Sequence, residues 1–126
     1  MTENELSHSI IESAIEVHKV LGGPGLLESV YEESLVWELQ QKGLKISRQV
    51  EVPISYKGNS LASPLRLDLL VNNQIILEVK ATTNNNPLYA AQLLTYLRLL
   101  DMKLGLVLNF GYPVLKDGIH RVVNRL

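Results

Sequence analysis

The feature that most constrains this fold is a pair of apolar segments, residues 65–71 and 75–81, separated by the polar tripeptide Asn-Asn-Gln. This arrangement predicts a β-hairpin in the core of a small protein. The same segments also contain Asp68, Glu78 and Lys80. Such side chains are almost never fully buried unless they are paired or bound to a metal. A core hairpin with these three charges therefore needs a specific explanation.

The register of the hairpin follows from its apolar pattern. A two-residue loop would place Asp68 opposite Leu77 and send Glu78 to the other face. A three-residue loop places Asp68 opposite Glu78 and leaves the other face wholly apolar, so we favour it, because the face that must be buried sets the register. The expected pairs are Val71–Ile75, Leu69–Leu77 and Leu67–Val79 on the apolar face, and Leu70–Ile76, Asp68–Glu78 and Arg66–Lys80 on the other.

Two carboxylates that face each other repel, and a cation between them would justify the arrangement. Mg²⁺ is the natural candidate, because it takes oxygen ligands and is commonly held by one or two carboxylates. Lys80 would then stand beside the metal-bound water, where it could orient that water or offset phosphate charge. The residues alone leave an alternative open, a surface ion cluster in which Lys80 and Arg66 pair with Glu78 and Asp68.

The other elements follow from apolar spacing and from helix-capping residues. Thr2 with Glu5 predicts a capping box, and Asn86 before Pro87 predicts a helix start. We expect helices at residues 4–21, 27–41 and 87–101, and strands at 45–56, 65–71, 75–81, 103–110 and 119–123. The order α-α-β-β-β-α-β-β predicts an α/β fold, a mixed sheet flanked by helices. Trp37 and most tyrosines are expected in the core, and His18 on a helix surface.

Length and composition set further limits. The 126 residues fit a single domain spanning 1–126. The chain has no cysteine, which excludes disulfides and thiolate metal sites and fits a cytoplasmic location. We recognise no secretory signal and no membrane-spanning segment. A net charge of −1 argues against a large phosphate-neutralising surface, but not against a local groove. The basic residues that could line one are Lys42, Lys45, Arg48, Arg98 and Lys103.

The residues also resemble a known group of proteins. Asp68, a spacer and Glu78-Val79-Lys80 look like the metal-binding core of the PD-(D/E)xK nuclease superfamily, although Leu67 replaces the proline of its name. The topology αβββαβ of that restriction-endonuclease-like fold is similar to the predicted order of helices and strands, with an extra N-terminal helix. Gly25-Leu26-Leu27-Glu28-Ser29-Val30-Tyr31 matches the motif of the GxxExxY protein family, and Asn109-Phe110-Gly111 resembles its late segment. Gln92 to Tyr96 resembles the QxxxY element of the RecB-like branch.

The resemblance implies a role for each motif residue. Asp68, Glu78 and the Val79 carbonyl would bind the metal, and Lys80 would activate or position the attacking water. Glu28 would add a carboxylate, whereas the structural alternative is a first-turn glutamate favoured by the helix dipole. Tyr31 would pack against or brace Glu28. Gln92 and Tyr96 would orient Lys80 or contact phosphate, and the alternative is an ordinary pair on one helix face.

The sequence thus predicts a Mg²⁺-dependent nuclease, with Mn²⁺ as a substitute ion and DNA favoured over RNA as the substrate. A second hypothesis is a non-catalytic module that keeps the nuclease fold and binds nucleic acid or protein. The small size and slightly acidic balance of the chain support it. A homodimer could supply a missing binding surface, because two-fold pairs are the commonest assembly.

Overall fold

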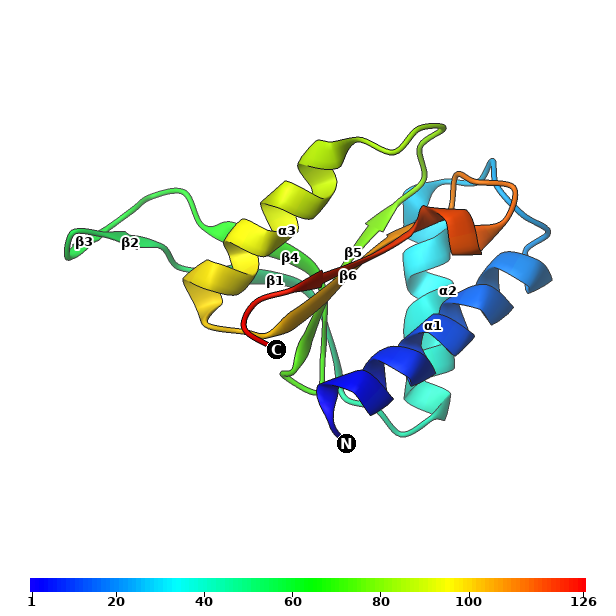
Figure 1. The fold of residues 1–126 in the computed structure, drawn as a ribbon, viewed down its shortest axis with the longest axis horizontal. Coiled ribbons are helices and arrows are strands. Elements are labelled where there is room, and N and C mark those ends of the chain that lie inside the picture. Colours follow the sequence, from blue (N-terminus) through cyan, green and yellow to red (C-terminus); the bar gives the residue numbers. More distant parts are fainter.

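The computed structural model describes all of residues 1–126, and its elements follow the predicted order (Figure 1). The helices are α1 (Glu3–Val20), α2 (Glu28–Gln41), α3 (Pro87–Leu100) and the 3₁₀ helix η1 (Leu115–Gly118). The strands are β1 (Ile46–Val52), β2 (Ser55–Tyr56), β3 (Asn59–Ser60), β4 (Leu65–Val71), β5 (Ile75–Lys80), β6 (Leu104–Asn109) and β7 (Ile119–Val123). No helix is long and apolar enough to cross a membrane.

Local sequence accounts for the ends of these elements. The predicted capping box is present at the start of α1, where Thr2 and Glu5 bond each other reciprocally. Asn86 caps α3 by accepting a hydrogen bond from the Leu88 amide, and Pro87 opens the helix. The strand expected at 45–56 is shorter than predicted, because β1 ends before Pro53, which has no N–H to donate to a ladder. The residues after it form a separate hairpin, β2–β3.

The five long strands form one mixed sheet in the order β1-β4-β5-β6-β7. Strands β5 and β6 are parallel and are joined through α3, while the other neighbouring pairs are antiparallel. Helices α1 and α2 cover one face, and α3 covers the other (Figure 1). The chain therefore has the predicted α/β restriction-endonuclease-like fold.

The β4–β5 hairpin confirms the predicted register but corrects the predicted faces. Val71 pairs with Ile75 and Leu69 with Leu77, as expected for the three-residue loop. The ladder stops there, and Leu67 packs on the α3 side of the sheet whereas Val79 packs on the α1–α2 side. The prediction of a wholly apolar face is therefore wrong for Leu67, because β4 and β5 are no longer paired beyond Leu69.

Two predictions about single aromatic residues are wrong. His18 is buried, not on the surface: its Nε2–H donates to the Tyr112 carbonyl at 2.9 Å, and its ring packs against Phe110. Trp37 is 58 % exposed and lies outside the core. His18 lies near the end of α1 and Trp37 in α2, and residue spacing along a helix does not fix which residues the neighbouring segments cover.

Candidate active site

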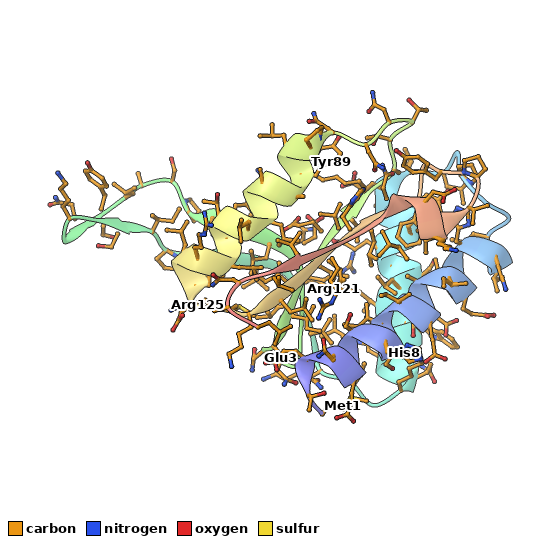
Figure 2. The ribbon with its side chains drawn as sticks, viewed as in Figure 1. Met1, Glu3, His8, Tyr89, Arg121 and Arg125 are labelled. Atoms are coloured by element: carbon orange, nitrogen blue, oxygen red, sulfur yellow. The ribbon has the colours of Figure 1, made fainter.

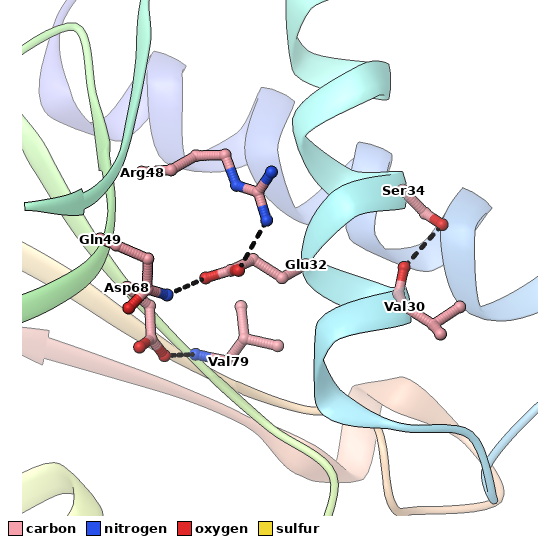
Figure 3. A network of polar contacts seen from close by, with 7 residues as sticks. All are labelled: Val30, Glu32, Ser34, Arg48, Gln49, Asp68 and Val79. Carbon is pink, nitrogen blue, oxygen red and sulfur yellow. Dashed lines mark hydrogen bonds and ion pairs between the residues drawn. The ribbon is translucent and has the colours of Figure 1, made fainter.

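Asp68 lies where β4 separates from β5. In β1, the facing position is occupied by Gln49, whose φ of 48° interrupts the regular strand between the pairs Arg48–Leu69 and Val50–Leu67. The Asp68 carboxylate accepts a hydrogen bond from the Val79 amide at 2.8 Å (Figure 3). A side-chain acceptor thus bridges the two strands after their main-chain pairing has ended, which fixes Asp68 beside the end of β5.

Glu78 is the most perturbed acid of the site. It is only 5 % exposed, and its Oε1 has no hydrogen-bond partner. Burial, followed by the charge of Asp68, raises the pKa of Glu78 from 4.5 to about 9. An unpartnered buried carboxylate oxygen is costly unless a ligand satisfies it. The effect of Asp68 on Glu78 indicates that their carboxyl groups are close together, as predicted. They are not a regular cross-strand pair, because the β4–β5 ladder ends before Asp68.

Lys80 ends β5 and forms no salt bridge. Its Nζ lies over the ring of Tyr89, 4.8 Å from the centroid, and Figure 2 shows Tyr89 at the start of α3. Its positive charge lowers the pKa values of Glu78 and Glu28, although burial outweighs this effect at both. The alternative prediction, an ion cluster in which Lys80 and Arg66 pair with Glu78 and Asp68, is therefore wrong. Arg66 instead forms a salt bridge with Glu51 on β1 at 3.1 Å.

Glu28 is the first residue of α2 and is exposed, but it lies within the electrostatic reach of the site. Partial burial raises the pKa of Glu28, Asp68 and Glu32 raise it further, and Lys80 opposes them. A glutamate that only compensated the helix dipole would show a lowered pKa. The raised pKa of Glu28 therefore shows that burial and the charge of Asp68 outweigh any effect of the helix dipole.

Tyr31 organises the loop that leads into α2. Its fully buried ring stacks on Phe110 with centroids 4.6 Å apart. Its hydroxyl donates to the Gly23 carbonyl at 2.7 Å and accepts from the Leu26 amide at 3.2 Å. Tyr31 therefore holds the glycine-rich turn in place and forms no hydrogen bond with Glu28, so the expected bracing is indirect, through the helix start.

Replacing Tyr31 by phenylalanine should lower the free energy of unfolding by about 1–2 kcal/mol, because the Gly23 carbonyl loses its buried donor. Urea unfolding would measure this loss, and amide exchange at Leu26 should quicken. Tyr56→Phe is the matched control, because the Tyr56 ring is exposed and its hydroxyl makes no hydrogen bond. Equal stability of the Tyr31 variant and wild type would contradict this role.

A buried acid network next to the site was not predicted from the sequence. Glu32, 6 % exposed, is bonded by the Arg48 guanidinium at 3.1 Å and by the Gln49 amide at 2.9 Å (Figure 3). Because Gln49 lies at the β1 position facing Asp68, this network ties α2 to the interrupted part of the sheet. The spacing of four residues between Glu28 and Glu32 was the available indication, since such residues share a helix face.

The charges of the candidate site affect Tyr96 on α3, whereas Gln92 makes no defined contact. Burial, followed by the charges of Glu78 and Asp68, raises the pKa of Tyr96. Gln92 is exposed and forms no hydrogen bond. Tyr89, which contacts Lys80, was not predicted as a site residue, although it lies two helical turns before Tyr96 on the same face.

Asn109 at the end of β6 holds the loop that follows β5. It is fully buried, and its side-chain oxygen accepts hydrogen bonds from the Thr82 and Gly111 amides at 3.1 and 2.9 Å. The Phe110 amide donates to the Lys80 carbonyl at 2.8 Å, which continues the β5–β6 ladder to that residue. A Cβ on Gly111 would lie 1.9 Å from the Thr82 carbonyl oxygen, so only glycine fits this crossing.

The donor set of the site suits a hard cation. Asp68 and Glu78 supply carboxylate oxygens, one of them buried and without a partner, and Mg²⁺ is typically held by one or two carboxylates with water completing its shell. No group of three or more acids or histidines is close enough to form an all-protein metal cage. None of the surface pockets is lined by Asp68, Glu78 or Lys80.

The class of protein follows from a comparison of this chain with known protein families. A family model described as the PD-(D/E)XK nuclease superfamily matches residues 4–122, which is nearly the whole chain. The chain therefore belongs to the PD-(D/E)XK nuclease superfamily, whose members act on nucleic acid. No curated protein and no solved structure gave a significant match.

Proposed function

We propose that this chain is a divalent-metal-dependent nuclease that hydrolyses phosphodiester bonds, with Mg²⁺ as its ion and DNA as its preferred substrate. The observation that carries the proposal is Glu78, a buried carboxyl with a partnerless oxygen next to Asp68. Its burial is difficult to explain in a protein that leaves the site empty. The superfamily membership supports the same reaction.

Each residue of the site has a proposed role. Asp68, Glu78 and the Val79 carbonyl would hold the ion, which would polarise the scissile phosphate and lower the pKa of water. The salt-bridge-free ammonium of Lys80 would orient the attacking water and offset charge that develops on the phosphate oxygens. Tyr89 limits the positions that this ammonium can take.

The motifs that surround the site support a finer placement, in the GxxExxY family and the RecB-like branch. Glu28 would add a water-binding or ion-binding carboxylate from α2. Tyr96 would face the phosphate, and Gln92 would join it when substrate is bound. Two observations support this assignment, the held turn before Glu28 and the proximity of Tyr96 to Glu78.

The test is a cleavage panel of single- and double-stranded DNA and RNA, each with Mg²⁺, with Mn²⁺ and with EDTA. We expect metal-dependent cleavage that falls at least about 100-fold in Asp68→Asn, because loss of one preorganised electrostatic contact at the reacting centre costs about that much. Asp117→Asn, an exposed acid on η1, should cleave like wild type. Cleavage that survives in EDTA would contradict the proposal.

A second candidate function is a non-catalytic module that retains the fold. The observations that favour it are the net charge of −1 and the absence of a three-acid cluster. Metal-independent binding of nucleic acid or protein, with no cleavage of any substrate in the panel, would establish it.

A further inference from the structure

The β2–β3 hairpin projects from the body of the molecule and contributes nothing to its core. Figure 1 shows it extending away from the sheet, beyond the end of α3. All ten residues from Ser55 to Pro64 are exposed. Two large apolar side chains among them, Tyr56 and Leu61, are 60 % and 44 % exposed. Packing therefore does not explain why the chain keeps this hairpin.

The hairpin is nevertheless built to hold one shape. Ser55 pairs with Ser60 and Tyr56 with Asn59, and the Leu61 amide donates to the Ile54 carbonyl at 2.9 Å. Lys57 and Gly58 at its tip both have positive φ, 49° and 81°, as a tight two-residue turn requires. A preformed hairpin loses little conformational freedom when it binds a ligand.

The hairpin has one positive charge and no negative charge. The chain has 13 acidic residues, yet none lies between Val52 and Leu67. Lys57 is the cation at the tip, and its Nζ lies over the Tyr56 ring at 5.4 Å from the centroid. Of the basic residues nearer the site, Arg48 is bonded to Glu32 and Arg66 to Glu51. Lys57 is thus a cation free to contact phosphate.

The position of the hairpin relates it to the candidate active site. It joins β1 to β4, the strand that carries Asp68, and Gly58 precedes Asp68 by ten positions. Extended chain advances about 3.3 Å per residue, so the tip lies at most about 33 Å from Asp68. One turn of a duplex is about 34 Å long, so a duplex at the site could span this distance.

We propose that the β2–β3 hairpin is a second contact surface for duplex nucleic acid, where Lys57 contacts a backbone phosphate and Tyr56 packs against a sugar or base. This inference rests on the proposed function, because it adds a remote contact for the same substrate. We therefore expect the chain to prefer duplexes long enough to contact both the hairpin and the candidate active site.

The test measures binding in EDTA, by fluorescence anisotropy, to a 30-base-pair DNA duplex, a 10-base-pair duplex and a 30-nucleotide single strand. The double variant Tyr56→Ala/Lys57→Ala should bind the long duplex about 10-fold more weakly, and its salt dependence should fall by about one unit of slope. The short duplex should be bound as by wild type. Lys19→Ala, an exposed lysine on α1, is the charge-matched control and should change neither.

The outcomes of this test distinguish the proposed hairpin contact from the proposed nuclease function. Equal loss of affinity for the long and short duplexes, or no loss, would overturn the hairpin contact while cleavage by wild type upholds the proposed function. A change in sedimentation mass of the double variant would show that the hairpin joins two copies, which would also overturn it. Failure of wild type to bind or cut any nucleic acid would overturn both proposals.

Discussion

Replacing Glu78 by glutamine should stabilise the metal-free protein at pH 8, although the position is buried. Burial, followed by the charge of Asp68, raises the pKa of Glu78 from 4.5 to about 9. Between these two values the unfolded chain releases a proton that the folded chain retains, so the free energy of unfolding falls as the pH rises. Glutamine has the same size and no proton to release. At pH 8 we expect a gain of the order of 3–5 kcal/mol.

A pH series of urea unfolding checks the sign of this effect. Below the ordinary pKa of 4.5 both proteins have a neutral side chain at position 78, and their stabilities should differ little. The advantage of Glu78→Gln should grow as the pH rises toward 9 and level off above it. Glu33→Gln, at an exposed position of α2, is the matched control and should show no such trend. A pH-independent difference would contradict the burial of an ionisable group.

Added Mg²⁺ should narrow the difference in stability between the two proteins. A ligand that binds only the folded state stabilises it by about 2.7 kcal/mol at 100 times its dissociation constant. Wild type should gain this stability at pH 8, because the ion would favour ionised Glu78, whereas Glu78→Gln should gain little. Thermal unfolding with and without the ion measures both responses. An equal response of the two proteins would exclude Glu78 as a ligand.

The fold was predictable because each element has its own local indication. The capping box at Thr2, the Asn86-Pro87 helix start and the three-residue loop of the hairpin all agree with the structure. The break in β4 was not predictable from parity, because parity assumes a regular strand. The positive φ of Gln49 and the side change between Leu67 and Leu69 are tertiary features of two paired strands.

The candidate site was predictable where one strand carries it and less so where separate elements meet. Glu78 and Lys80 share β5, and their proximity follows from alternation. The burial of Glu32 against Arg48 and Gln49 depends on how α2 lies against β1, which no local pattern specifies. The contact of Tyr89 with Lys80 likewise depends on where α3 crosses the sheet.

Lys80→Ala should lower kcat for the best substrate of the cleavage panel by about 10²–10³-fold, the usual cost of removing one preorganised charge from the reacting centre. The loss of kcat should be larger than the loss of substrate affinity. Lys80 has no salt-bridge partner, so its ammonium is free to act on water or phosphate during the reaction. Affinity for the uncut substrate in EDTA should stay within about threefold of wild type, since the proposed role of Lys80 is to offset charge that develops in the transition state. Lys19→Ala, an exposed lysine on α1, should retain full activity.

The same substitution should raise the Mg²⁺ concentration that gives half-maximal activity. The Lys80 charge lowers the pKa values of Glu78 and Glu28, so its removal should raise both pKa values further and leave Glu78 more firmly protonated. A metal must displace that proton, and more of it is needed at a given pH. Raising the pH should therefore restore half-saturation without restoring kcat, because the missing ammonium is not replaced. Recovery of kcat at high Mg²⁺ would show that Lys80 acts only by tuning the carboxylates, and retention of full activity would remove it from the site.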